Sequence, residues 1–83
     1  MTYRVEFEGA AVVQLNGLPS VAFDALVQRV VALVEAPWDA DLVAPGNDPA
    51  YRQVTFGGGY GLLSFHVDDA AEQISIFDIA WIG

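Results

Sequence analysis

The C-terminal part of the chain constrains the fold most, because it contains three apolar segments joined by short turns. These segments are AYRQVTF (residues 50–56), GLLSFHV (61–67) and QISIFDIAWI (73–82), all rich in the β-branched and aromatic residues that favour strands. Their connections, GGGY and DDAAE, contain residue types that form turns. Consecutive strands with short connections pair antiparallel, so the sequence predicts a three-stranded meander.

The glycine-rich connection invites comparison with a phosphate-binding loop. Such loops place their glycines directly before a helix, whose N-terminal N–H groups then meet the phosphate. Here GGGYG is followed by the apolar segment LLSFHV, and no GK[ST] motif follows. We therefore predict a hairpin turn in which glycine supplies a positive φ, and no bound cofactor.

The segments before the meander read as one strand and two helices. Residues 2–8 alternate apolar and polar side chains, as in a half-buried strand, and residues 8–18 favour a short helix capped by Gly17. A longer helix is predicted between Pro19 or Ser20 and the stop at Pro37. Its apolar positions follow the i, i+3, i+4 spacing, at Phe23, Leu26, Val27, Val30, Leu33 and Val34.

This element order predicts an α+β fold in a single domain spanning residues 1–83. The order is β-α-α-β-β-β, and short connections place both helices on one face of a mainly antiparallel sheet. Residues 38–50, WDADLVAPGNDPA, are predicted to form an irregular loop.

The final strand has an unusual pattern, because apolar residues occupy both of its faces. Strict alternation puts Ile74 and Ile76 on one face and Phe77, Ile79 and Trp81 on the other. With helices on one side only, the second side needs another cover. Three covers fit this pattern: a second copy in a homodimer, a partner polypeptide, or the loop between Pro37 and Pro49.

The charge balance limits the partners. Eleven acidic residues, three arginines and no lysine give a formal charge of −8. Each phosphate contact normally needs a cation, so general binding to nucleic acid or to an anionic membrane is not expected. A basic partner polypeptide is easier to accommodate.

The sequence contains no targeting or metal-binding signal. No apolar run reaches the roughly 20 residues of a membrane span, and the N-terminal stretch does not match a signal peptide. We therefore expect a cytoplasmic protein. With one histidine and no cysteine, we predict no zinc or other transition-metal site.

One group of residues has the chemistry of a nucleic-acid-cleaving site. Tyrosines stack on bases, an arginine holds a phosphate, and a histidine transfers a proton. These residue types lie on the first two strands of the meander and in the turn between them, at Tyr51, Arg52, Tyr60 and His66. The alternative is two tyrosines at the rim of the core and an exposed arginine.

Taken together, these segments resemble the RelE/ParE family of small toxins from bacterial toxin–antitoxin pairs. YRVEFEGAAVVQLNGLP is similar to the first strand and helix of the family, and AFDALVQRVVALVEAPWD to its second helix. AYRQVTFGGGYGLLSFHVDD resembles its strand–turn–strand unit, and ISIFDIAW its last strand. The resemblance covers nearly all 83 residues and implies two helices packed on a sheet of about four strands.

The resemblance also implies functions. RelE-like members cleave messenger RNA on the ribosome, ParE-like members inhibit DNA gyrase, and both bind a cognate antitoxin. Arg52 matches a basic position of the ribonucleases, but Val54 stands where another basic residue is common. Tyr60 is followed by Gly61 and not by the arginine of those enzymes. We therefore expect antitoxin binding with weak or absent ribonuclease activity, and keep as alternatives an active messenger-RNA cleaver and a non-enzymatic inhibitor of a target such as gyrase.

Overall fold

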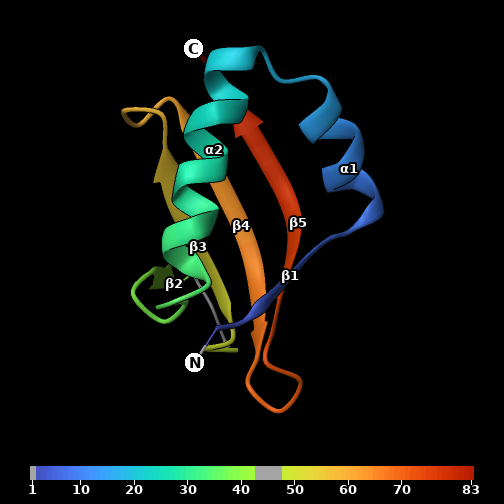
Figure 1. Cartoon of the computed structure of the whole chain (residues 1–83), viewed down its shortest axis with the longest axis vertical. Helices are drawn as coiled ribbons and strands as arrows, with labels where there is room; N and C mark the ends of the chain where they lie inside the picture. The colour runs from blue at the N-terminus through green and yellow to red at the C-terminus, as the bar shows by residue number, and fades with distance from the viewer. Residues whose placement is uncertain (1, 43–47) are drawn as a thin grey trace.

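The three C-terminal segments form the centre of a mixed sheet in a computed structural model that describes residues 2–42 and 48–83. The elements are β1 (Arg4–Phe7), α1 (Gly9–Asn16), α2 (Ser20–Leu33), β2 (Asp41–Leu42), β3 (Tyr51–Phe56), β4 (Gly61–Asp68) and β5 (Gln73–Trp81). Their order across the sheet is β1-β5-β4-β3-β2, with β1 parallel to β5 and the other neighbours antiparallel (Figure 1). The α+β class and the predicted meander are confirmed.

The region expected to be an irregular loop contains a strand. Residues 41–42 form β2, which pairs with Arg52 and Gln53 at the edge of the sheet. Two residues are too short a segment for a period-2 pattern to reveal. The remainder of the predicted loop between residues 43 and 47 lies outside the described residues.

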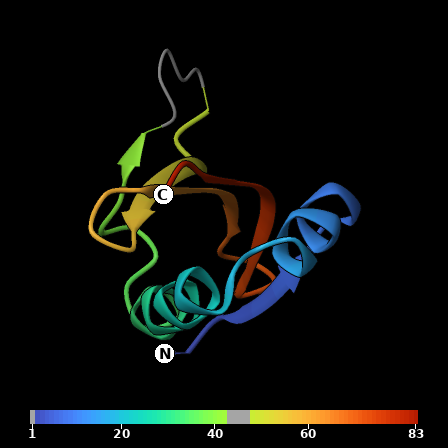
Figure 2. The same cartoon turned by 90° about the horizontal axis from the view of Figure 1, so that it is seen from above.

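One face of the sheet carries the core, and α2 packs across that face (Figure 2). Side chains at alternate strand positions point towards this helix, as the pleat of a strand requires. The buried core consists of Ala11, Leu26, Leu33, Val54, Phe56, Leu63, Phe65, Val67, Ile74, Ile76 and Ile79.

The first helix lies beside the second half of β5, which β1 is too short to accompany. β1 pairs with β5 only as far as Ile76, and α1 continues along the same edge. There Gln14 accepts a hydrogen bond from the backbone N–H of Ile79 at 2.7 Å and donates one to the Asp78 carboxylate at 2.9 Å. Its side chain thus replaces a strand neighbour for β5, because a buried N–H needs a partner.

The glycine-rich connection is a hairpin turn, as predicted. Gly57, Gly58 and Gly59 all have positive φ, between +62° and +93°. At Gly57 a Cβ atom would lie 2.6 Å from the Trp81 ring, so only glycine leaves enough room for this ring. The glycines therefore bend the chain between β3 and β4 and let Trp81 close over the turn.

The prediction that β5 is apolar on both faces is wrong, because the strand contains a bulge. Ser64 pairs with Asp78 and Phe65 with Ile76, which leaves Phe77 as an extra residue on β5. A bulge reverses the alternation after it, so Ile79 returns to the same face as Ile76. Both are buried in the core, and Trp81 packs against it. Apart from Phe77, the apolar residues of β5 thus face the core, and no second covering layer is needed.

Within the described residues, no helix is both long enough and apolar enough to cross a membrane.

Candidate functional site

Two of the four predicted site residues meet on the face of the sheet that points away from α2. Tyr51 and His66 are directly opposite each other in the β3–β4 pairing, and their ring centroids are 4.8 Å apart at an interplanar angle of 62°. Phe77, the bulge residue, packs edge-on against Tyr51 at 5.7 Å. The three rings form one aromatic cluster on this face.

Arg52 lies on the other face, because its side chain alternates with that of Tyr51. Its guanidinium donates hydrogen bonds to the carbonyl oxygens of Pro49, at 2.7 Å, and Ala40, at 2.9 Å. It also lies over the Trp38 ring, 5.0 Å from the centroid, as in a cation–π contact. In this conformation Arg52 ties β3 to the segment that leads into β2, and it does not face His66.

Tyr60 lies in the turn at the far end of the β3–β4 hairpin. At a rise of about 3.3 Å per residue, the length of β3 separates it from the Tyr51–His66 pair by about 17 Å. The ring of Tyr60 is 59% exposed and neighbours Trp81, with centroids 6.3 Å apart. The structure therefore brings Tyr51 and His66 together and leaves Arg52 and Tyr60 apart from them.

An apolar groove between the two helices was not predicted as a site. It has a volume of about 180 Å³ and is lined only by apolar residues: Phe7, Leu15, Phe23, Leu26, Val27, Val30 and Val31. Of these, Phe23 is 41% exposed, Val27 43% and Val31 63%. The signal in the sequence is the width of the apolar stripe on α2, which exceeds what contact with the sheet can bury.

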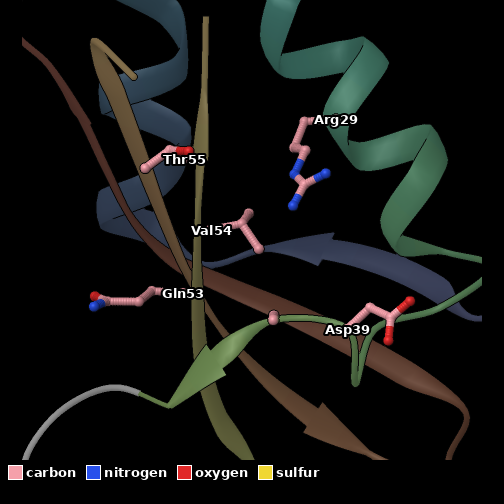
Figure 3. Close-up of a pocket in the computed structure, with 6 residues that line it drawn as sticks. Arg29, Asp39, Gln53, Val54 and Thr55 are labelled. Carbon is pink, nitrogen blue, oxygen red and sulfur yellow. The ribbon is translucent and has the colours of Figure 1, made fainter. Parts of the chain in front are cut away.

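A second hollow, mostly polar, lies on the opposite flank of α2, next to β3. Its volume is about 250 Å³, and it is lined by Arg29, Asp39, Ala40, Gln53, Val54 and Thr55. Figure 3 shows Arg29 extending from α2 towards β3, on the side to which Val54 points. The Nε atom of Arg29 is buried and has no hydrogen-bond partner among the described residues.

No group of three or more potential metal ligands occurs among the residues that the structure describes. Gln53, Ser64 and Ser75 add neutral polar groups to the face with the aromatic cluster, in register with its strands. Asp78, opposite Ser64, and Asp68, two residues after His66, add carboxylates to the same face. The chemistry on this face is thus one imidazole with aromatic, neutral polar and acidic neighbours, whereas the groove between the two helices offers an apolar surface.

Comparison with models of known protein families finds no match, and comparison with curated protein sequences finds none either. Solved structures do match. The isolated RelE toxin of Escherichia coli superposes with a TM-score of 0.84 at 17% sequence identity, covering 98% of this chain and 85% of that chain. The RelBE2 toxin–antitoxin complex of Mycobacterium tuberculosis gives 0.83 at 19% identity, covering 99% and 100%.

The RelE–RelB complex of the archaeon Pyrococcus horikoshii gives a TM-score of 0.74 at 20% identity, covering 100% of this chain and 98% of that chain. These likenesses extend over whole chains, and they come from a bacterial toxin, a mycobacterial complex and an archaeal one. The chain therefore has a RelE-like fold, and the resemblance read from the sequence is confirmed at the level of the fold.

Proposed function

We propose that this chain is the toxin-like component of a toxin–antitoxin pair and that it acts mainly by binding a partner polypeptide, the cognate antitoxin. The likeness to RelE–RelB complexes supports this proposal. The observation that carries it is the apolar groove between α1 and α2. Its large apolar side chains are exposed to water, and a partner that buried them would gain binding free energy.

The charges around the groove indicate the chemistry of the partner. Asp24 precedes Val27 by one helical turn and so lies at the margin of the apolar stripe of α2, and Glu35 lies just beyond the end of this helix at Leu33. Both are exposed. An amphipathic helix fits such a groove through apolar residues at i, i+3, i+4 and i+7, and lysine or arginine at its margins would complement the acids.

The test is co-purification of this chain with the polypeptide encoded beside it, followed by measurement of the Kd. Val31→Asp places a charge in the groove, and we expect it to raise the Kd at least tenfold, which corresponds to about 1.4 kcal/mol. Gln28→Asp makes the same addition of charge on the exposed polar side of α2, and should leave the Kd within about twofold of the wild-type value. An unchanged Kd for Val31→Asp, or no complex at all, would contradict the proposal.

We propose further that ribonuclease activity is weak or lost. Arg52, the basic residue predicted to hold the scissile phosphate, is bound to two carbonyl oxygens instead. Tyr60 is distant from His66, the predicted acid or base. A formal charge of −8 also opposes approach to RNA. Multiple-turnover cleavage of ribosome-bound messenger RNA by the purified protein, abolished by His66→Ala and Arg52→Ala, would instead establish the alternative of an active messenger-RNA cleaver.

The separation of Arg52 and Tyr60 from the Tyr51–His66 pair also favours a non-enzymatic toxin over an enzyme, if the chain proves toxic. A protein that inhibits a target such as gyrase by contact needs no phosphate-binding cations. Growth arrest with intact cellular RNA, relieved by Val31→Asp and not by His66→Ala, would identify that mode. A homodimer is the remaining occupant of the apolar groove, and sedimentation of the isolated chain with and without Val31→Asp would reveal it.

A further inference from the structure

The outer edge of β3 is paired with another strand over only part of its length. β2 accompanies β3 only at Arg52 and Gln53, so the edge beyond, around Thr55, has no neighbouring strand among the described residues. An unpaired strand edge presents N–H and C=O groups that can pair with another chain.

The pattern of hydrogen bonds shows which groups point outwards. The N–H of Val67 donates to the carbonyl of Ala50, so this pair is of the hydrogen-bonded type. Hydrogen-bonded and non-hydrogen-bonded pairs alternate along an antiparallel ladder. Thr55 is an odd number of positions from Ala50 and pairs with Leu62, so its own N–H and C=O point away from β4. They face the open edge.

Arg29 stands beside this edge with an unused donor. The hollow that it lines also includes Thr55, and its buried Nε–H donates no hydrogen bond to a described residue. A buried donor without a partner is destabilising, so a ligand that supplies an acceptor here is favoured. A carboxylate fits best, because it accepts two parallel hydrogen bonds from a guanidinium.

From these observations we propose that the Thr55 edge and Arg29 together bind a short extended segment of a partner polypeptide that carries one carboxylate. The backbone of the segment pairs with the N–H and C=O of Thr55, as in strand addition. The acidic residue of the segment points its side chain towards α2, where its carboxylate reaches Arg29. Asp39 lines the same hollow and repels a second acid, so the neighbouring residues of the segment are neutral or basic.

This site deepens the proposed partner binding and rests on it, but it is separate from the apolar groove. Arg29 follows Val27 by two residues, which places it about 200° further around α2. A partner that used both sites would therefore contact both flanks of α2, with a helical segment on one flank and an extended segment on the other.

The probe is the five-residue peptide Thr-Val-Glu-Val-Thr, acetylated at its N-terminus and amidated at its C-terminus. Titrated into the ¹⁵N-labelled protein, it should shift the amide resonance of Thr55 and the Nε–H resonance of Arg29. The same peptide with a central glutamine should bind at least tenfold more weakly. The Arg29→Gln variant should bind the glutamate peptide at least tenfold more weakly as well. The Arg4→Gln variant, which loses one positive charge far from the site, should bind this peptide like the wild type.

The proposal is overturned if neither resonance shifts at peptide concentrations up to about 10 mM, which corresponds to about 2.7 kcal/mol of binding. It is also overturned if the glutamine peptide binds equally well, or if Arg4→Gln weakens binding as much as Arg29→Gln. Because the probe is not the antitoxin, a failure here leaves the apolar groove as an antitoxin site. Conversely, peptide binding without any complex with the neighbouring gene product would refute the proposed function alone.

Discussion

At the residue scale, Gly61 is required because Phe56 packs directly over it. The two residues are opposite each other in the β3–β4 pairing, and a Cβ atom at Gly61 would overlap the Phe56 ring. We expect Gly61→Ala to lower the free energy of unfolding by about 1–3 kcal/mol, as overpacking does. Gly58→Ala is the matched control, because a Cβ there meets nothing within 4 Å. Placing alanine at the positive φ of this position should cost about 1–2 kcal/mol. Urea denaturation measures both, and an unchanged free energy of unfolding in Gly61→Ala would contradict the packing argument.

The hydroxyl of Tyr3 donates a hydrogen bond to the Asp69 carboxylate, which also accepts one from the Trp38 indole at 3.1 Å. The hydrogen bond to Asp69 raises the pKa of Tyr3 above its ordinary value of 10.0. A raised pKa in the folded state means that this stabilisation is complete below about pH 10 and is lost as the pH rises through the folded-state pKa. In Asp69→Asn, spectrophotometric titration should show Tyr3 ionising at lower pH, whereas Asp68→Asn should leave it unchanged.

Arg52 shows where reasoning from residue types stops. The sequence correctly places it on a strand beside a tyrosine, and the pairing of Tyr51 with His66 follows from the hairpin register. What the sequence does not reveal is that Trp38 and two backbone carbonyls, from a segment with no clear periodicity, surround its guanidinium. Arg29 was missed for the opposite reason: it lies within a strong helical pattern, where a single arginine is typical of an exposed face.

At the scale of secondary-structure elements, the Gln14 side chain of α1 makes two hydrogen bonds to β5. Gln14→Leu would leave the N–H of Ile79 and the Asp78 carboxylate without this partner. We expect a loss of about 1–3 kcal/mol in the free energy of unfolding and faster hydrogen exchange at the Ile79 amide. Asn16→Leu, on the same helix and exposed, should change neither. Unchanged exchange at Ile79 would show that α1 does not protect this edge.

The elements themselves were predictable to the extent that they are periodic. The long helix begins at Ser20 as expected, and the meander follows from three apolar segments and two turns. The bulge at Phe77 and the strand β2 were not predictable, because each depends on the pairing of a few residues with a neighbouring strand. A bulge is an insertion relative to a partner, which a single strand's pattern does not display.

At the scale of the whole molecule, the negative charge is not balanced by its few cations. The hydrogen bonds of Arg4 and Arg52 end on neutral oxygen atoms of Ala71, Gln73, Pro49 and Ala40. Salt screens repulsion among the acids without weakening these contacts much. We therefore expect the Tm to rise when NaCl is increased from low ionic strength to about 0.5 M, where the Debye length is about 4 Å. A Tm that falls with salt would indicate stabilising ion pairs.

The excess of acidic residues also affects how fast a partner arrives. Because eleven acids outnumber three arginines, the net charge of −8 gives the protein a negative long-range field in solution. A basic polypeptide would be drawn in from beyond contact distance, at a rate well above the 10⁵–10⁶ M⁻¹s⁻¹ typical of neutral pairs at low salt. A chain of this kind would capture a newly made partner quickly, before the short-range contacts decide how long the complex lasts.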